Sequence, residues 1–506
     1  MLGVDIGTTA TKVVAFDTGG AELASESVGY PLYEPAPGHV EQDPVEICAA
    51  VVQATAAVVS AVGADGVAGL SFSAAMHSLI GLDAGGVLLT RSITWADTRA
   101  AEQAERLRAG ADGLALHRRT GTPVHPMSPL VKLIWFAEHE PELCARAARW
   151  IGIKEYVLGE LCGSTVVDLS MASSTGLLDL TSLAWDETAL RLAGVRAAQL
   201  GTPVPTTTVL DGLRPAAAAR LGLDAAVPVV VGAGDGVLAN LGLGAVKPGV
   251  AACSIGTSGA LRVVVDKPAV DRRGRVFCYA LTEDRWVVGG AINNGGVVLS
   301  WTGSALAPDL GEAPEAELLR LAETVPPGSD GLIMLPYLLS ERAPWWSSLP
   351  RGAYLGLTRS HGRPELVRAA IEGVCQQLAL VLESLRDAGL AVEEVRGTGG
   401  FARSPMWRQL LADCLDLPVR FADGHDGSGF GAALLGMQAL GLIASIDVAA
   451  ELVQITDEVA PDPDHAATYA QLRAVAEDAY LALEPTFGRL RALRPDLPDT
   501  PEPSDP

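Results

Sequence analysis

One short pattern occurs twice in this chain at a constant offset. Residues 4–17 read VDIGTTATKVVAFD and residues 253–266 read CSIGTSGALRVVVD. Each copy has an apolar strand, a tight I-G-T-[TS] turn and a second apolar strand, which is the pattern of a β-hairpin with hydroxyls at its tip. Because the second copy begins near the middle of the chain, the repeat predicts two similar domains that face each other across a cleft. The alternative, two unrelated hairpins that match by chance, stays open.

The rest of the sequence alternates strand and helix patterns. Residues 227–244, VPVVVGAGDGVLANLGLG, predict a buried strand, a glycine turn and a helix. Apolar residues make up 49% of the 506 residues, enough for large buried cores and against global disorder. We therefore expect an α/β fold with mixed sheets. Further helices are expected over 44–63, 130–149, 153–162, 367–385, 427–440 and 467–493, and a strand over 66–73.

The charge balance excludes one class of partner. The chain has 37 Lys and Arg against 60 Asp and Glu, a net charge of −23. Nonspecific nucleic-acid binding depends on an excess of Lys and Arg, so it is not expected here. An anionic ligand would need a local positive pocket inside this repulsive field.

The cysteines and the hydropathy pattern indicate in which cellular compartment the protein is expected. The seven cysteines are scattered and never spaced C-x-x-C, which favours reduced thiols over a disulfide framework or a zinc site. Residues 1–17 do not read as a secretory signal, and the sequence shows no apolar run of about 18 residues for a bilayer span. We expect a cytoplasmic protein with no membrane partner.

The twinned turns resemble phosphate-binding loops. Glycine lets backbone N–H groups approach an anion, and hydroxyls add donors, so Thr8 and Thr9 in the first copy and Gly256 and Thr257 in the second could grip a polyphosphate from both sides. Lys12 either adds charge to the first turn or is a solvated strand lysine. These residue types predict a polyphosphate ligand.

Two aspartates are candidates for the chemistry. Asp5 stands beside the first turn where the second copy has Ser254, so it is predicted to contact Mg²⁺, with a strand-end cap as the alternative. Asp235 ends an apolar strand between Gly234 and Gly236. It could accept a proton from a substrate hydroxyl or bind the metal, or it could be the N-cap of the following helix.

A third glycine turn lies in GTGGFARSPMWRQL. Gly399 and Gly400 would let a flat base or a ribose approach the backbone, and Ser404 precedes a helix. Without other support, a plain strand-to-helix turn capped by Ser404 is the simpler interpretation.

With these pieces, the sequence is identified as similar to the FGGY carbohydrate kinases, which lie within the sugar kinase, heat-shock ATPase and actin superfamily. The resemblance covers roughly residues 1–485. The pieces that carry it are GVDIGTTATK, SAAMHSLI, ITWADTRA, GAGDGVLANLGLGAV, CSIGTSGA, LPYLLSERAPWW, RGAYLGLT, GTGGFARSPMWRQLLAD and GSGFGAALLG. MHSL, WADTRA, GTPVHPMSPLVKL, IGIKEYV and GGFARSPMWRQ resemble the gluconate kinases in particular, although xylulose kinases share the Met-His pair.

The resemblance implies a duplicated actin-like, ribonuclease H-like fold. It divides the chain into an N-terminal domain (1–245), a C-terminal domain (246–485) and an acidic, Pro-rich, disordered tail (486–506). It implies Asp235 as catalytic base and metal partner, with Asp5 also at the metal. The implied ATP site holds Thr8, Thr9, Lys12, Gly256, Thr257, Gly399, Gly400 and Ser404, and the implied sugar site holds Met76, His77, Trp95, Asp97, Arg99 and Asp235.

The family pattern also implies a reaction. ATP, with Mg²⁺, would phosphorylate a primary hydroxyl of an open-chain sugar acid, most simply gluconate. The substrate carboxylate would need positive groups, for which Arg99, His77, Lys132 and Lys154 are the candidates. The alternatives are a xylulose or other pentulose kinase, and an ATP-binding sensor without transfer activity.

The chain departs from the family pattern at two positions, and some properties stay open. Asp426 stands where Glu is usual and Ser340 where Gly is usual, and the first of these bears on the nucleotide pocket. The residues leave the oligomeric state open, a homodimer included.

Overall fold

Two mixed β-sheets organise the protein. The computed structural model describes residues 1–311, 314–422 and 427–493. The first sheet has the order β13 (Val209–Leu210), β14 (Val229–Gly234), β5 (Leu70–Ala74), β1 (Leu2–Ile6), β2 (Ala10–Phe16) and β3 (Glu22–Gly29). The second has the order β17 (Phe277–Ala280), β18 (Trp286–Ile292), β16 (Gly259–Val265), β15 (Gly249–Ile255), β21 (Val392–Thr398), β22 (Val419–Ala422) and β23 (Ile455–Val459).

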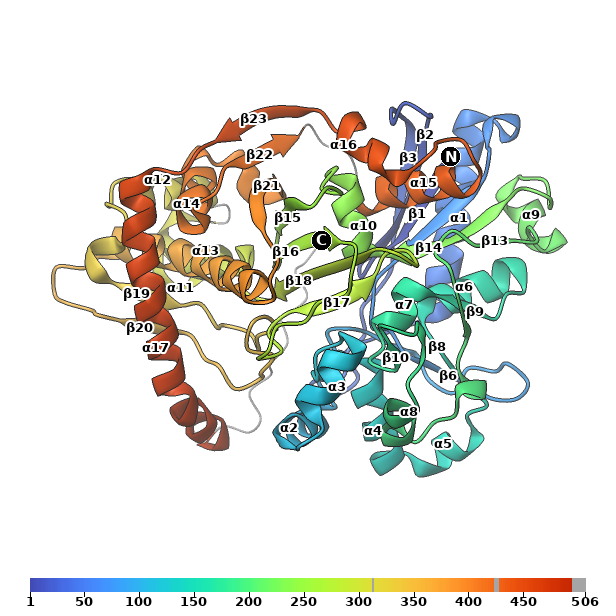
Figure 1. The fold of residues 1–506 in the computed structure, drawn as a ribbon, viewed down its shortest axis with the longest axis horizontal. Coiled ribbons are helices and arrows are strands. Elements are labelled where there is room, and N and C mark those ends of the chain that lie inside the picture. The colour runs from blue at the N-terminus through green and yellow to red at the C-terminus, as the bar shows by residue number, and fades with distance from the viewer. Residues whose placement is uncertain (312–313, 423–426, 494–506) are drawn as a thin grey trace.

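The two sheets repeat the same topology. In the first, β3, β2 and β1 are antiparallel neighbours, and β5 and β14 continue parallel to β1. In the second, β18, β16 and β15 are antiparallel, and β21 and β22 continue parallel to β15. Each repeated segment is the β1–β2 or β15–β16 hairpin, so the predicted duplicated α/β fold is confirmed (Figure 1).

The two hairpins differ in register by one residue. Ile6 pairs with Thr11, whereas Ile255, at the equivalent position, pairs with Gly259. The first turn is therefore one residue longer than the second. The sequence match fixes the strands, but not the way in which each turn closes.

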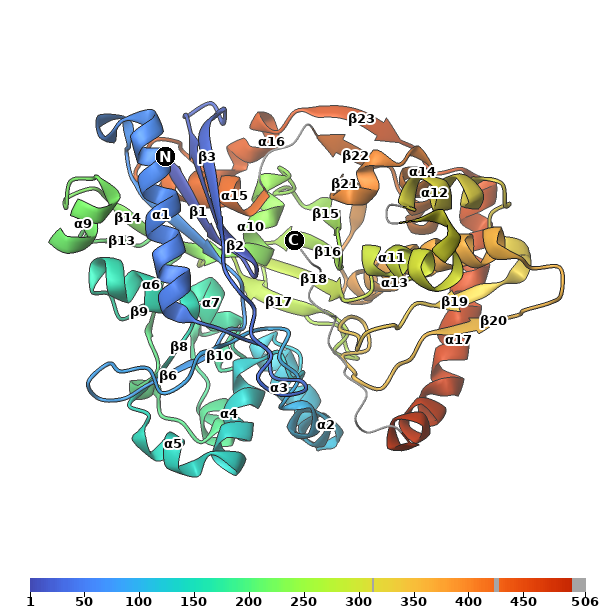
Figure 2. The ribbon, with the colours of Figure 1, turned by 180° about the vertical axis from the view of Figure 1, so that it is seen from behind.

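Helix α1 (Pro44–Val62) covers one face of the first sheet. It begins after the N-cap Asp43, which accepts from the Val45 N–H at 2.8 Å, and it packs on β1, β2 and β3 (Figure 2). In the part of the chain that the structure describes, α1 is the one helix long and apolar enough to cross a bilayer, and half of its apolar window is buried inside the protein. Its composition is that of a core helix.

The region between β5 and β14 forms a small lobe with its own apolar cluster, which includes Leu133, Phe136 and Trp150. One helix was expected over 130–149, but Pro141 divides this stretch into two helices, and a strand begins at Arg149. The elements of this region are β6 (Ile80–Leu82), β7 (Ser92–Ile93), α2 (Ala101–Ala109), α3 (Gly113–Thr120), α4 (Pro129–His139), α5 (Pro141–Arg146), β8 (Arg149–Ile151), α6 (Ile153–Cys162), β9 (Val166–Asp168), α7 (Leu169–Ser173), β10 (Leu178–Asp179), β11 (Ala184–Trp185), α8 (Glu187–Ala193), β12 (Thr202–Val204) and α9 (Pro215–Leu221). Of these, α6 and α9 pack on α1 and extend the main core.

The second sheet packs against a long buried helix, α13 (Arg363–Asp387). Its neighbours include α11 (Gly296–Leu306), α12 (Glu315–Glu323) and α14 (Pro405–Leu415). The chain closes with α17 (Pro463–Leu493). The tail was predicted from residue 486, but the helix continues to Leu493, and residues 494–506 lie outside the described residues.

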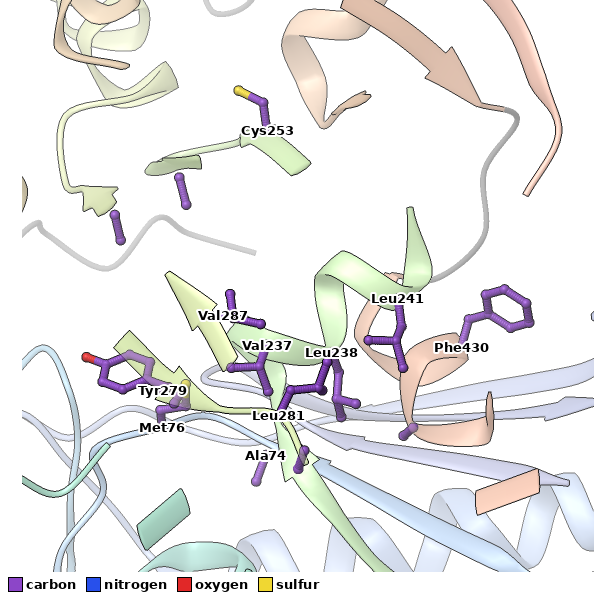
Figure 3. Close-up of a cluster of buried hydrophobic side chains, with 14 of the residues drawn as sticks. Ala74, Met76, Val237, Leu238, Leu241, Cys253, Tyr279, Leu281, Val287 and Phe430 are labelled. Atoms are coloured by element: carbon purple, nitrogen blue, oxygen red, sulfur yellow. The ribbon is translucent and has the colours of Figure 1, made fainter. Parts of the chain in front are cut away.

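Two helices join the halves. Helix α10 (Asp235–Gly242) packs closely against α15 (Gly427–Ala439), which belongs to the second half of the sequence and yet lies on β1 and β5 of the first sheet (Figure 1). Figure 3 shows Val237 and Leu238 of α10 beside Val287 and Leu281, and Leu241 beside Phe430 of α15. One apolar core therefore runs through both halves, across the predicted boundary at 245/246.

Candidate active site

The two predicted phosphate turns are exposed at their tips and anchored at their bases. Thr9, Gly256 and Thr257 are exposed. The Gly7 N–H donates to the Ala10 carbonyl at 3.0 Å, and the Gly256 N–H donates to the Ser258 carbonyl at 2.8 Å. Such turns present backbone N–H groups and hydroxyls without a long loop to order.

Each turn is also tied to a second element. Trp95 Nε1 donates to Thr8 Oγ1 at 2.9 Å, which places one predicted sugar residue directly against the first turn. At the second turn, the N–H groups that precede and begin α11 donate to the carbonyls of Thr257 and Gly256 at 3.1 and 2.7 Å. The positions of the two turns are therefore fixed by the fold.

Asp235 is the first residue of α10, directly after β14. The N-cap position belongs to Gly234, whose N–H donates to Ser170 Oγ at 3.0 Å, so Asp235 is not the cap. Its carboxylate accepts from the Gly236 N–H at 2.6 Å. Burial first, and then the neighbouring charge of Asp5, raise the pKa of Asp235 to about 6, against the opposing effect of Arg262. This carboxyl is a stronger base than a free aspartate.

Asp5 lies near the end of β1, and Asp235 follows β14, two strands that both pair with β5. The charge of Asp5 acts on Asp235. Ser428 of α15 donates its hydroxyl to Asp5 Oδ2 at 2.7 Å, and Asp5 faces Lys12 across the β1–β2 pairing. Two carboxylates this close repel each other, and a cation between them removes the repulsion. Mg²⁺ is commonly held by one or two carboxylates together with substrate phosphates, so the pair fits that ion. Among the described residues, no group of three or more His, Cys, Asp or Glu side chains gathers into a larger metal site.

Met76 and His77 follow β5, and Met76 lies beside the two glycines that flank Asp235. A Cβ at Gly234 would come within 2.7 Å of the Met76 side chain, so the glycine makes room for Met76 beside the carboxylate. His77 holds a left-handed backbone with φ of 68°, a strained conformation of the kind that clusters at functional sites.

The His77 ring is neutral. Its Nδ1 donates to the Ser174 carbonyl at 2.8 Å, which leaves Nε2 as an acceptor, 3.5 Å from the Tyr279 hydroxyl. Burial lowers the pKa of His77 to about 3, so the ring carries no charge at neutral pH. His77 can therefore contribute a hydrogen bond, but not a positive charge for a carboxylate.

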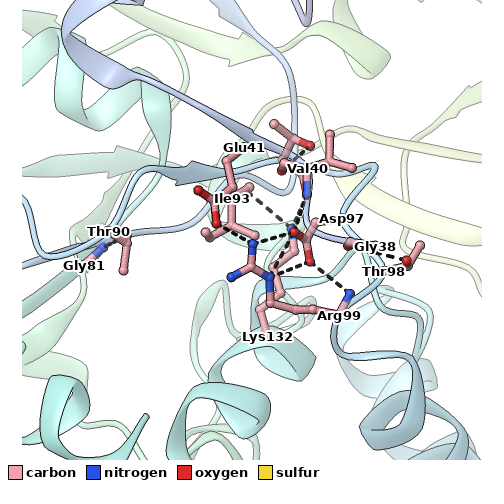
Figure 4. A network of polar contacts seen from close by, with 11 residues as sticks. Gly38, Val40, Glu41, Gly81, Thr90, Ile93, Asp97, Thr98, Arg99 and Lys132 are labelled. Atoms are coloured by element: carbon pink, nitrogen blue, oxygen red, sulfur yellow. Dashed lines mark hydrogen bonds and ion pairs between the residues drawn. The ribbon is translucent and has the colours of Figure 1, made fainter. Parts of the chain in front are cut away.

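Asp97 and Arg99 pair with each other. Arg99 Nε lies 2.9 and 3.0 Å from the two Asp97 oxygens, and Nη2 lies 2.6 Å from Glu41 Oε1 (Figure 4). Asp97 also accepts from the Val40 N–H at 2.7 Å. The Arg99 guanidinium therefore already faces two carboxylates, and the expectation that it binds a substrate carboxylate stays a prediction.

The two lysines proposed as positive groups are also engaged inside the protein. Lys132 Nζ donates to the carbonyls of His77 and Thr94 at 2.7 and 2.6 Å. Lys154 Nζ forms a fully buried ion pair with Asp168 at 2.8 Å. Both ammonium groups are thus already engaged inside the protein, and their role toward a substrate carboxylate stays a prediction.

Sequence reasoning missed two arginines. Arg262 lies on β16, at the position where the first repeat has Val13, and Arg342 follows the LLSE segment. The Arg342 guanidinium lies 5.0 Å from the centre of the Trp95 ring. A charged residue inside the apolar second strand of one repeat was the signal that could have identified Arg262.

The predicted nucleoside turn lies beside the second phosphate turn. Gly399 has φ of 108°, and a Cβ there would come within 2.3 Å of the Ile255 carbonyl oxygen, so only glycine allows this close approach. Gly400 is exposed beside it. Ser404 is the N-cap of α14 and accepts from the Trp407 N–H at 3.2 Å, which is the simpler of its two interpretations.

Of the two positions that depart from the family pattern, Ser340 and Asp426, the structure describes only Ser340. Ser340 is buried, and its carbonyl accepts from Asn293 Nδ2 at 2.6 Å. Asp426 lies outside the described residues.

Comparisons with known proteins identify the family of this chain. The N-terminal domain of the FGGY family of carbohydrate kinases matches residues 1–242, and its C-terminal domain matches residues 251–440. A gluconokinase of Bacillus licheniformis is 43% identical over 97% of both chains, and a xylulose kinase of Bacillus subtilis is 32% identical over 89% of this chain and 90% of its own. The crystal structure of a gluconate kinase from Lactobacillus acidophilus, 37% identical, covers 97% of this chain and 99% of its own with a TM-score of 0.92. This chain belongs to the FGGY family of carbohydrate kinases.

Proposed function

We propose that this protein is a gluconokinase, which transfers the γ-phosphoryl group of ATP to the primary hydroxyl of D-gluconate. The observation that carries the proposal is Asp235, a carboxylate with a raised pKa at the start of α10, beside Asp5 and the predicted sugar residue Met76. The 43% identity to the gluconokinases of two Bacillus species supports gluconate over other sugars.

Asp235 would orient the primary hydroxyl and accept its proton as the new O–P bond forms. Phosphoryl transfer depends on positioning and charge stabilisation more than on covalent help from the protein. A carboxyl whose pKa lies near 6 is ionised at neutral pH and still basic enough to take a proton in the transition state.

The two turns would hold the nucleotide phosphates. Thr8 and Thr9 lie in the first turn, with Lys12 on the adjoining strand β2, and Gly256 and Thr257 lie in the second turn. The nucleoside would lie along Gly399 and Gly400, with Ser404 capping the helix that follows. Asp5 and Asp235 would hold Mg²⁺, which offsets charge on the phosphate oxygens when it is bound.

The decisive experiment is a panel of sugars and sugar acids, assayed by ADP release with mass detection of the phosphorylated product. We expect D-gluconate to give 6-phosphogluconate with the highest kcat/KM. Preference for D-xylulose would identify a pentulose kinase instead. ATP turnover without a phosphorylated product would support an ATP-binding sensor of the same fold.

We also propose that the protein works in the cytoplasm. All seven cysteines, each within the described residues, are unpaired thiols, which suits a reducing cytoplasm.

A further inference from the structure

The part of the structure around Asp235 holds buried hydrogen-bond donors that lack acceptors. Arg262 Nε and Arg342 Nε are buried and have no hydrogen-bond partner among the described residues. His125 accepts from the Met127 N–H at Nδ1, so its proton is on Nε2, and that buried donor also lacks an acceptor there. An unsatisfied buried donor costs about 1–3 kcal/mol, and a ligand rich in acceptors would satisfy all three.

The two arginines come from separate elements and meet at the site. An ideal Cβ on Gly236, the residue after Asp235, would lie 4.0 Å from Arg262 Nε and Nη2. Arg342 reaches the same region from the second half, with Nη2 on the Ile292 carbonyl at 3.1 Å and its guanidinium over Trp95, which itself contacts the first phosphate turn.

Neither guanidinium has a close ion-pair partner among the described residues, although the charge of Asp235 acts on both at longer range. In the described ranges, no ion pair joins Arg262 or Arg342 to a carboxylate within 4.0 Å, whereas Arg99, Arg275 and Arg368 all have one. Glu341, the residue before Arg342, is occupied by Asn293, Asn294 and the Arg342 backbone N–H. The two guanidinium groups also repel each other, and burial lowers the pKa of Arg342 to about 10.

An anion bound between the two arginines would accept hydrogen bonds from their unsatisfied Nε–H groups and offset the repulsion between the two positive charges. Planar guanidinium groups match the geometry of a carboxylate and can bind both of its oxygens. The chain as a whole has a net charge of −23, so two half-buried arginines without a close ion pair form the kind of local positive pocket that an acidic substrate needs.

We propose that Arg262 and Arg342 together bind the carboxylate of the sugar acid, while Asp235 receives the primary hydroxyl at the other end of the carbon chain. His125 supplies a further donor to the same substrate. This assignment rests on the proposed gluconokinase function and replaces Arg99, Lys132 and Lys154 as the groups that recognise the acid.

The test compares these two arginines with a third arginine that already has an ion-pair partner inside the protein. Arg262→Met and Arg342→Met are assayed at pH 8, where Asp235 is ionised, against Arg396→Met as the matched control. Arg396 is a buried arginine of the second sheet whose guanidinium contacts Glu394 and the Leu243 carbonyl. We expect each test variant to raise the KM for D-gluconate roughly a hundredfold, the loss typical when one partner of a buried charge pair is removed. The KM for ATP should stay within about threefold.

Further measurements distinguish binding of the substrate carboxylate from binding of the γ-phosphate and from a wrong assignment of the substrate. Arg262→Lys should restore part of the affinity, and calorimetric titration with D-gluconate should show the same weakening without turnover. A rise in the KM for ATP in place of that for gluconate would assign the pair to the γ-phosphate and overturn the proposal. Unchanged gluconate affinity in both methionine variants would overturn it too. Wild-type protein that ignores gluconate but phosphorylates xylulose would instead refute the proposed function, and that result is visible before any variant is made.

Discussion

Asp235 combines two requirements that conflict in a folded protein. Its pKa is raised to about 6 because it is surrounded by protein and lies near Asp5, so the ionised form is destabilised by the fold. Catalysis nevertheless needs that form as the proton acceptor. A strained catalytic group of this kind trades stability for activity.

Replacing Asp235 with Asn should therefore abolish activity and stabilise the protein. We expect kcat to fall roughly 10²–10⁴-fold, the usual contribution of a general base. Because the folded-state pKa exceeds the unfolded value, the penalty is present above pH 6 and disappears below the unfolded pKa. The Tm of D235N should thus exceed that of the wild type by more at pH 8 than at pH 4, measured by thermal unfolding. A Tm gain independent of pH would contradict this account.

The same group sets the pH dependence of the reaction. The kcat/KM for sugar reports the free enzyme and should rise with pH through about 6 to a plateau as Asp235 loses its proton. Asp5 raises this pKa, so Asp5→Asn should move the rising limb to lower pH even though it weakens the metal-dependent reaction. A rising limb that stays in place in Asp5→Asn would show that the two carboxylates do not interact.

The Lys154–Asp168 ion pair stabilises the segment that positions His77. Both side chains are almost fully buried, and Asp168 also caps α7, whose end leads to the Ser174 carbonyl that holds His77. Lys154→Met leaves a buried carboxylate without its partner and should cost about 3–5 kcal/mol in urea unfolding. The double variant Lys154→Met, Asp168→Asn removes both charges and should recover part of that loss. Equal losses in single and double variants would mean that the Asp168 cap matters more than the charge pair.

At the level of single residues, sequence patterns predicted the candidate site residues that lie in turns. They missed the contacts between side chains from separate elements. Asp235 and the two glycine-threonine turns stand out because glycine and hydroxyl residues interrupt apolar strands. The partners of Arg99, by contrast, come from residue 41 as well as residue 97, and that contact exists only after folding. Arg262 and Arg342 are 80 positions apart in sequence, so no local spacing joins them.

At the level of elements, the contact between α10 and α15 depends on small residues. A Cβ on Gly431 would lie 2.3 Å from the Leu238 carbonyl oxygen, and one on Gly242 would lie 1.9 Å from the Gly427 carbonyl oxygen. The glycines let two helix backbones approach closely, and α10 carries Asp235 at its N-terminus. The sequence predicted α15 as a helix with a small-residue face, but its partner in the first half could not be read from periodicity.

Gly431→Ala should therefore destabilise the protein by about 1–3 kcal/mol, because the new methyl group meets backbone that cannot move aside. Gly488→Ala is the matched control, since it lies in helix α17 with no atom within 4 Å of its Cβ. The control should gain roughly 0.5–1 kcal/mol from helix propensity. Chemical denaturation measures both, and similar changes in the two variants would show that the α10–α15 contact is looser than the structure indicates.

At the level of the whole molecule, the segment around Trp346 reaches from the second half to the small lobe of the first. The Arg108 guanidinium donates to the Trp346 carbonyl, and the His125 ring meets the Trp346 ring edge-on at 6.0 Å. Trp346 is buried and is held on its own side by a hydrogen bond from Nε1 to the Arg275 carbonyl at 2.9 Å. These contacts close the molecule over Trp95 and Arg342, which is the arrangement that would exclude water from the transferred phosphoryl group.

A kinase that opens to take its substrates must break these contacts, because the buried site has to admit a sugar and a nucleotide. We expect small-angle scattering of the ligand-free protein to give larger dimensions than this structure, and D-gluconate with a non-hydrolysable ATP analogue to reduce them. Arg108→Ala removes one closing contact and should raise the ratio of ATP hydrolysis to gluconate phosphorylation, since a less closed site admits water. Arg285→Ala, whose partner Asp447 lies in the same half of the sequence, is the control and should leave that ratio unchanged. Dimensions that do not change on adding both ligands would mean that substrates enter the closed form, and the contacts of Trp346 would then be structural alone.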